Sequence, residues 1–425
     1  MLGGEFDVSF ISLLVLDWIE FALRWLHVIT AIAWIGSSFY FIALDLGLRR
    51  HDNLPKLVHG EEWQVHGGGF YHIQKYLVAP PALPEHLTWF KWESYATWLS
   101  GFALMAVVYY VGADIYLIDT DKAELPLWGA IGLSLGVLAI GWVGYDRLCR
   151  SPLGQNPTAL MLCLYVILVM LAYGLDKVFT GRAAFLHLGA VTATIMSFNV
   201  LMVIIPNQRI VVADLKEGRV PDARYGQIAK LRSTHNNYLT LPVIFFMLSN
   251  HYPLAFATDY AWIIASIVFL MGVTIRHYFN SKHARKASPL WTWGVTFVLF
   301  VIIMALSLAP LFSHKEPDYD EVSAADFTVR EQRLAASEHF EDVRDIVLGR
   351  CSMCHAIEPF YDGVRWPPKG VMLETDKQII SHAHSIITQS ALSHAMPPAN
   401  VSYMEPEERQ ILLDWYRQAL SSDKS

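Results

Sequence analysis

The chain has 425 residues, of which 54% are hydrophobic and 17% charged, and its formal net charge is −7. It is more apolar than an ordinary soluble domain, and its acidic balance gives no indication of nucleic-acid binding. The apolar residues gather in runs of about twenty before residue 313, and the remainder has the composition of a soluble domain. The sequence therefore predicts an integral membrane domain over 1–312, a tether over 313–335 and a soluble domain over 336–425.

Eight apolar runs are long enough to cross a bilayer, which takes about 20 mostly apolar residues. They cover 18–44, 94–112, 126–145, 157–175, 183–205, 237–252, 259–278 and 290–312. The run at 237–252 is the shortest and the least apolar. The first ten residues, "MLGGEFDVSF", carry acids instead of the basic segment of a cleavable signal peptide.

The basic residues in the connections predict the orientation of these spans. The loops after the first, third, fifth and seventh spans together hold sixteen lysines and arginines, whereas the alternate loops hold three. Because basic loops stay in the cytoplasm, both termini are expected on the periplasmic side of a bacterial inner membrane. The soluble domain would then lie in the periplasm.

The segment "CSMCH", residues 351–355, carries the most specific motif in the chain. A Cys-x-x-Cys-His sequence is typical of covalent c-type haem attachment, in which Cys351 and Cys354 bind the haem and His355 reaches the iron. This attachment is made outside the cytoplasm, where the charge count also places the segment. The alternatives are a redox pair of thiols and half of a zinc site, but the other two cysteines, Cys149 and Cys163, lie in the membrane domain.

Methionine commonly provides the second axial ligand of such a haem, and Met396 in "HAMPP" is the best candidate. It precedes a predicted helix that begins near Pro406, and another helix is predicted over about 337–350. Rival ligands are Met372, Met404, His384 and His394. The expected fold is thus all-α: a membrane bundle of about eight spans, followed by a small domain similar to class I cytochromes c.

Two of the histidines inside predicted spans are expected at similar depth in the membrane. His27 lies in the first span and His187 in the fifth, and the predicted topology places both in the outer half of the membrane. Ionisable residues inside a membrane usually have a function, so these two are candidate axial ligands of a b-type haem. The alternative is that each histidine hydrogen-bonds a neighbouring helix.

A second group of polar residues is predicted at the cytoplasmic face, where the long first loop meets the ends of the fifth and sixth spans. Arginine, amides and aromatic rings suit a flat anionic heterocycle, although helix capping is the alternative for any one residue. The candidate bases are His72 and His235, with Glu61 as the alternative. The candidate binding residues are Arg209, Lys75, Gln208, Asn236, Asn237 and His66.

Several stretches resemble bacterial membrane-bound urate oxidases (urate hydroxylases). These are "WLHVITAIAWIGSSFYF", "GEEWQVHGGGFY", "FKWESYATWLSG", "HNNYLTLPVIFFMLSNHYP" and the C-terminal "CSMCH". The resemblance covers essentially the whole chain. It implies oxidation of urate to 5-hydroxyisourate in purine breakdown, with electrons passing through cytochrome c to a terminal oxidase. Of the family's functional residues, only Cys351, Cys354 and His355 can be carried over.

Oxidation of urate with water as the oxygen source releases two electrons and two protons. The reaction therefore needs a base and an electron acceptor. The partners implied are urate, membrane lipid and a cytochrome c or terminal oxidase. The main alternative is a membrane cytochrome that oxidises quinol. A haem–copper oxidase is disfavoured because the chain lacks an adjacent His-His pair, and a transporter or sensor with a redox reporter is a further alternative.

Overall fold

The computed structural model describes residues 8–76, 80, 83–120, 122–309, 327–362, 364 and 367–421. The chain forms two compact units. One comprises Glu20–Ser313, and the other comprises Met1–Ile19 with His314–Ser425. The boundary at Ser313 coincides with the predicted end of the membrane domain. Residues 313–326 of the predicted tether lie outside the described residues.

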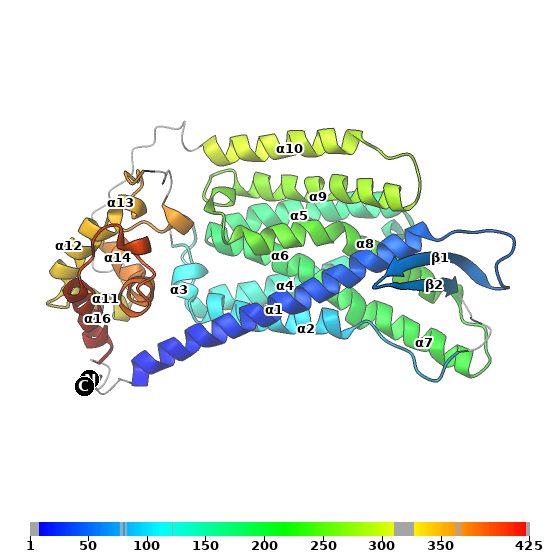
Figure 1. Ribbon diagram of the computed structural model, residues 1–425, viewed down its shortest axis with the longest axis horizontal. Helices are drawn as coiled ribbons and strands as arrows, with labels where there is room; N and C mark the ends of the chain where they lie inside the picture. The colour runs from blue at the N-terminus through cyan, green and yellow to red at the C-terminus, as the bar shows by residue number, and fades with distance from the viewer. Residues whose placement is uncertain are drawn as a thin grey trace. The chain divides into compact units, whose positions relative to one another are not determined.

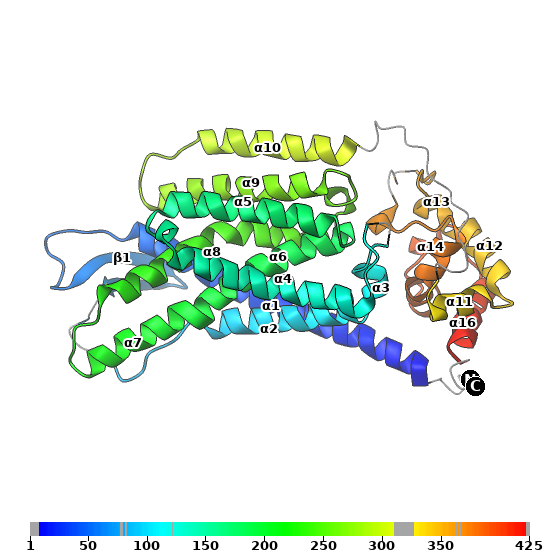
Figure 2. The same ribbon diagram turned by 180° about the vertical axis from the view of Figure 1, so that it is seen from behind.

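The larger unit is a bundle of long helices that run alternately in opposite directions (Figures 1 and 2). Its elements are α1 (Val8–Gly47, which begins in the other unit), β1 (Val58–His66), β2 (Gly69–Tyr76), α2 (Trp92–Met105), η1 (Ala106–Tyr110), α3 (Ala113–Tyr116), α4 (Leu127–Arg150), η2 (Pro152–Gln155), α5 (Pro157–Asp176), α6 (Gly181–Phe198), η3 (Asn199–Ile204), α7 (Ile205–Lys216), α8 (Ala223–Ser249), η4 (Pro253–Ala255), α9 (Ala261–His283) and α10 (Trp291–Leu308).

Six helical segments in the described part of the chain are long and apolar enough to cross a membrane. They are Leu14–Gly47, Leu127–Arg150, Pro157–Asp176, Gly181–Lys216, Ala261–His283 and Trp291–Leu308. The two remaining predicted spans form helices of a different character. α2 has only 14 residues before it passes into the π-helix η1, and α8 carries a polar run from Arg232 to Asn237.

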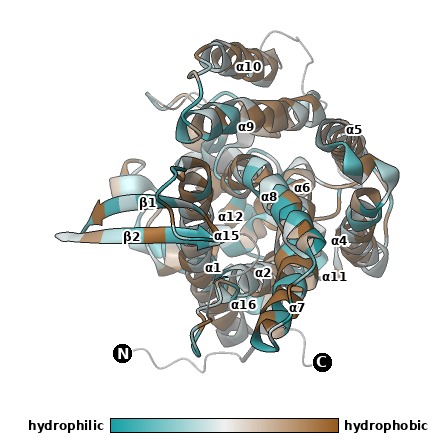
Figure 3. Cartoon of the chain, turned by 90° about the vertical axis from the view of Figure 1, so that its right-hand side faces the viewer, coloured by the Kyte–Doolittle hydropathy of each residue, from teal (hydrophilic) through white to brown (hydrophobic). Residues whose placement is uncertain are grey.

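The outside of the bundle is apolar, as a helix bundle surrounded by lipid requires. Large hydrophobic side chains such as Trp128, Ile140 and Phe297 are exposed, and Figure 3 shows hydrophobic residues along α10. α6 lies inside the bundle, where residues such as Leu188 and Ile195 are buried. This arrangement is compatible with a membrane protein.

The first connection contains a β-hairpin, which the sequence analysis did not predict. β1 and β2 pair in antiparallel register around the turn Gly67–Gly68, where both glycines have positive φ. The base of the hairpin lies against the end of α1, because a side chain at Gly60 would meet Leu48 Cβ at 3.0 Å. The hairpin is therefore held at one end of the bundle, called here the hairpin end.

α8 and α9 approach each other closely at one crossing. A Cβ at Gly272 would lie 2.6 Å from Cδ of Pro242, which lies inside α8. Only glycine permits this approach, since a proline ring cannot move aside easily. The crossing lies about one turn from Arg276 of α9, so it brings the polar residues of the two helices together.

The smaller unit is helical throughout its described part. It contains α11 (Val329–Ala335), α12 (Phe340–Arg350), α13 (Ser352–His355), η7 (Pro368–Gly370), α14 (Asp376–Ser381), α15 (Ala383–Ile386), η8 (Ile387–Leu392), η9 (Pro398–Asn400) and α16 (Pro406–Ser421). α12 and α16 confirm the two helices predicted here. They pack through Phe340 and the fully buried Trp415, whose indole N–H donates to the Leu334 carbonyl of α11. The last part of the predicted tether is thus a packed helix.

Candidate functional site

The Cys-x-x-Cys-His segment lies at the junction of α12 and α13. Burial raises the pKa of the Cys351 thiol to about 12, and it also raises the pKa of Cys354. A redox-active thiol pair needs a lowered pKa, so this environment opposes that alternative. His355 Nδ1 lies 2.8 Å from the Val371 carbonyl. Because Nδ1 donates its proton there, the lone pair is on Nε2, as a metal ligand requires.

The loop that holds Met396 is fixed by a buried arginine. Arg409 of α16 donates to the Met396 carbonyl at 2.9 Å and to Asn400 Oδ1 at 3.1 Å, and it also bonds the Ser390 carbonyl. Met396 is half-buried, whereas its rival Met404 is buried in the core of the unit. The assignment of Met396 as an iron ligand stays a prediction. The donor set of Cys351, Cys354 and His355 fits a c-type haem.

A first polar network joins α4, η3 and α8 in the bundle. Asn199 donates to Tyr145 Oη at 3.0 Å and to Asn236 Oδ1 at 2.9 Å, and Tyr145 Oη lies 2.8 Å from His235 Nδ1. Arg232 pairs with Asp146 at 2.6 Å and also donates to Asn199 Oδ1. The network compensates its own charge, because its buried arginine has a carboxylate partner. It connects the predicted site residues His235 and Asn236 through Tyr145 and Asn199, and their roles in catalysis and binding stay predictions.

A second polar group lies between α8, α9 and α1, and it is centred on Arg276. The guanidinium donates to Asn237 Oδ1 at 2.5 Å and to Asn280 Oδ1 at 3.1 Å, and it lies 4.3 Å from the ring centroid of Phe39. Arg276 is only 5% exposed. Within the described ranges, no carboxylate forms an ion pair with it. A buried cation held only by amides and a ring is costly unless an anion joins it.

Two titratable side chains near this arginine have buried atoms without a hydrogen-bond partner in the described part of the chain. They are Oε2 of Glu62 in β1 and Nδ1 of His283 in α9. The charges of Arg276 and Glu62 both act on His283. Arg276, Asn280 and His283 are spaced four and then three residues apart, so they share one face of α9. We call Phe39, Glu62, Asn237, Arg276, Asn280 and His283 the Arg276 cluster.

The candidate residues of the hairpin form a separate and more exposed group. Glu61 accepts from His51 at 3.1 Å and from His72 at 2.8 Å, and these contacts lower the pKa of its carboxyl to about 2. A carboxylate with such a pKa is a weak base, which argues against Glu61 as the base. His72 stacks on Trp63, with ring centroids 4.2 Å apart. His66 is exposed at the hairpin tip.

The remaining predicted binding residues lie away from the buried polar groups. Gln208 and Arg209 are exposed on α7, and Lys75 pairs with Asp45. The cations among the predicted binding residues were Arg209 and Lys75, but the buried arginines in the described bundle are Arg232 and Arg276. Arg276 had a signal in the sequence, because it lies inside the predicted seventh span.

The structure does not bring His27 and His187 together. His27 Nδ1 lies 3.0 Å from the Thr97 carbonyl, and the ring lies against Gly101 of α2. His187 is fully buried, with Nδ1 bonded to the Ala183 carbonyl and Nε2 to Ser134 Oγ. The two rings therefore have the neighbouring-helix contacts that were the alternative to a haem. A shared haem b stays a prediction and would require Ser134 to release His187 Nε2.

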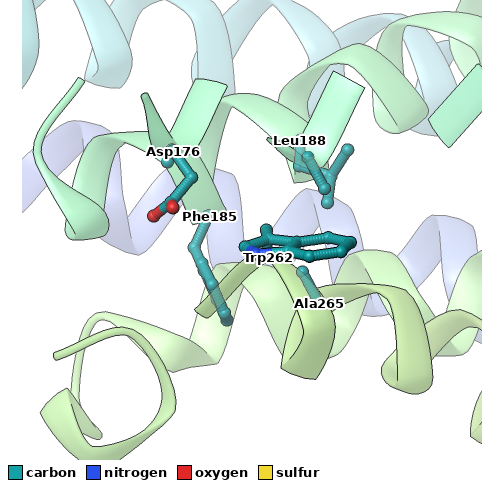
Figure 4. Close-up of a pocket in the computed structure, with 7 residues that line it drawn as sticks. Asp176, Phe185, Leu188, Trp262 and Ala265 are labelled. Atoms are coloured by element: carbon teal, nitrogen blue, oxygen red, sulfur yellow. The ribbon is translucent and has the colours of Figure 1, made fainter. Parts of the chain in front are cut away.

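A crevice between α5, α6 and α9 is not a binding site of useful size. Figure 4 shows Trp262 beside Leu188 and Ala265, with the carboxylate of Asp176 nearby. The crevice has no space for a water molecule. Asp176 lies 3.8 Å from Lys122, so its charge already has a partner.

Comparison with known proteins identifies the family to which the membrane bundle belongs. The family model described as "Urate oxidase N-terminal" matches residues 13–307. The chain belongs to this family. Searches of curated proteins and of solved structures return no match. Family membership indicates a urate-related function and an oxidoreductase activity, and it covers the bundle that contains the Arg276 cluster.

Proposed function

We propose that the chain is a membrane-bound urate oxidoreductase that converts urate to 5-hydroxyisourate, with water as the source of oxygen. The observation that carries the proposal is the buried Arg276, which lacks a carboxylate partner among the described residues. Urate is an anion at neutral pH. A urate anion beside this guanidinium would complete a charge-assisted pair, the kind of contact that gives both affinity and orientation.

The rest of the cluster suits the edges of the same heterocycle. Asn237 and Asn280 hold Arg276 through their amide oxygens, which leaves the orientation of the guanidinium fixed before a ligand arrives. Such preorganisation reduces the entropy lost on binding. Arg276 and His283 lie seven residues apart, which is about 10 Å along a helix. This separation suits a bicyclic ligand with hydrogen-bonding groups at both ends.

The electron acceptor in this proposal is a c-type haem attached through Cys351 and Cys354, with His355 and Met396 as axial ligands. When bound, the haem would accept electrons one at a time. A soluble cytochrome c or a terminal oxidase would take them onward. The protein's own contribution is to keep His355 Nε2 free through the Val371 contact and to hold the Met396 loop through Arg409.

We place the protein in the bacterial inner membrane with the hairpin end in the cytoplasm and both termini in the periplasm. The support is the count of sixteen basic residues against three, because the segments that carry the sixteen meet at the hairpin end (Figure 1). In that orientation, urate binds from the cytoplasm. No electron-transfer step is assigned to His27 and His187.

The test measures urate consumption and haem reduction by the purified Arg276→Gln variant. Losing one charge-assisted contact costs about 1.5–3 kcal/mol, so KM for urate should rise roughly ten- to a hundredfold. The matched control is Arg224→Ala, which removes an exposed arginine whose carboxylate partner is Asp222 on the surface. The control should keep the wild-type KM.

Two outcomes would overturn the proposal. If quinol reduces the haem of the wild-type protein and urate does not, the chain is an electron-transfer cytochrome instead. If urate is oxidised with an unchanged KM in Arg276→Gln but a raised KM in Arg209→Ala, the binding site lies at α7, as the sequence analysis expected.

A further inference from the structure

Glu62 occupies an unusual position for a carboxylate in a β-hairpin. It lies in β1, and its side chain turns toward the end of α1, where a Cβ on Gly47 would come within 2.6 Å of Glu62 Oε2. The same oxygen is buried and has no hydrogen-bond partner within the described residues. Unpaired buried carboxylate oxygens are costly, so this one is expected to serve a ligand or a proton.

The neighbouring imidazole has the matching feature. His283 Nδ1 is also buried without a partner in the part of the chain that the structure describes, and the charge of Glu62 acts on this ring. His283 shares its helix face with Arg276, the proposed anchor of the urate anion. Glu62 and Arg276 therefore both lie close enough to His283 for their charges to act on it, and neither Glu62 nor His283 belongs to the hairpin group formed by Glu61 and His72.

The geometry points to Glu62 as the general base of urate oxidation, with His283 as the acceptor of the second proton. This inference rests on the proposed function and names the groups that its chemistry requires. As a water oxygen bonds to C5 of urate, the water O–H bond breaks and its proton passes to Glu62. The second proton comes from a urate N–H bond, which breaks as the proton passes to His283, so the urate anion leaves as the anion of 5-hydroxyisourate. The two electrons released would leave in two one-electron transfers, for which the c-type haem of the proposed function would be the acceptor.

This assignment differs from the sequence-based candidates for physical reasons. Glu61 is held by two histidines, which lower the pKa of its carboxyl, and His72 is bonded to that same carboxylate. His235 Nδ1 is bonded to Tyr145, and although its Nε2 is buried without a partner within the described residues, it belongs to the network whose arginine already has the carboxylate of Asp146. Glu62 and His283 each have a buried atom without a partner among the described residues, and the charge of the unpaired Arg276 acts on His283. The other charged groups that act on His283 are Arg276 and Lys282 of α9.

The first experiment compares the wild-type protein with Glu62→Gln. A positioned base contributes about 10²- to 10⁴-fold to the rate, so kcat should fall at least a hundredfold, whereas KM for urate should change little. The acid limb of the pH–kcat profile, where the base becomes protonated, should disappear. Glu62→Asp should recover part of the rate, because it restores a carboxylate on a shorter side chain.

A second variant moves the carboxylate without removing it. Gly47→Ala places a methyl group at the position of Glu62 Oε2, and the flexible end of that side chain can swing away while the fold remains. We expect kcat to fall roughly tenfold or more for a displaced catalytic group. Gly36→Ala is the matched control on the same helix, since a Cβ there meets nothing within 4 Å. It should retain the wild-type kcat.

The outcomes separate this inference from the proposed function. If the wild-type protein does not oxidise urate, the proposed function fails. If the wild type oxidises urate and Glu62→Gln keeps kcat within threefold at every pH, with its acid limb intact, Glu62 is not the base. A wild-type kcat in Gly47→Ala also overturns the inference, because the buried position of the carboxylate would then have no role.

Discussion

Asp146→Asn should destabilise the bundle more than Arg232→Met, which removes the buried arginine that Asp146 binds. Asp146 accepts from Arg232 at 2.6 Å and from Arg150 at 2.7 Å. The Arg232 side chain is 3% exposed, whereas that of Arg150 is 69% exposed. Replacing the carboxylate leaves the buried guanidinium of Arg232 without an opposite charge, which lowers the free energy of unfolding by about 3–5 kcal/mol. The cost arises from Arg232 alone, because water solvates Arg150.

Replacing Arg232 instead of Asp146 should lower the stability of the bundle less. In Arg232→Met, Asp146 keeps its pair with Arg150, and the main loss is the bond to Asn199 Oδ1, worth about 1–3 kcal/mol when the acceptor is buried. A large domain loses about 2 °C in Tm per kcal/mol. Asp146→Asn should therefore lower Tm by roughly 6–10 °C, and Arg232→Met by roughly 2–6 °C. Thermal denaturation in detergent, followed by circular dichroism, measures both. Equal Tm values for the wild type and Asp146→Asn, or a lower Tm in Arg232→Met than in Asp146→Asn, would refute this reasoning.

Two further predictions concern the tail and the topology. Cys354→Ser should abolish stable covalent haem, while Met396→Ala should keep the haem but lower its potential and remove the near-infrared iron–sulfur band. An unchanged band in Met396→Ala would show that another residue is the ligand. An alkaline phosphatase fusion after Asp318 should be active and one after Gly218 inactive; the opposite result would contradict the positive-inside assignment.

The sequence predicted the helical class and the boundary near residue 313 because both follow from the distribution of apolar residues. The span predicted at 237–252, the least apolar of the eight, coincides with the second half of α8, and the first half carries the buried Arg232, His235 and Asn236. Averaged hydropathy cannot distinguish a polar residue facing lipid from one facing a partner helix. The hairpin was missed because "EEWQVHGGGFYHIQ" is short and mixes polar with apolar residues on both faces, so that Gly67–Gly68 is the main local signal of a turn.

The binding and catalytic candidates from the sequence and the Arg276 cluster have only Asn237 in common. The sequence indicated the hairpin end and included Asn237, but it selected cations in loops, because basic residues there are frequent. Burial, which distinguishes Arg276 from Arg209, depends on how α9 crosses α8. The unpartnered atoms of Glu62 and His283 are a property of three-dimensional packing alone. No pattern within one segment encodes them.

The π-helical segment η3 has a consequence for comparing relatives of this chain. A π turn accommodates one more residue than an α turn, and such segments often occur at functional sites. Asn199, the hub of the network with Tyr145 and Asn236, is the first residue of η3. Deleting one residue from Asn199–Ile204 would restore α-helical spacing and keep α7 near its present orientation, whereas a deletion from the regular part of α6 would rotate α7 by about 100°. Alignments of relatives should therefore place single-residue gaps here with care, since one misplaced gap shifts the register of every following residue of the helix.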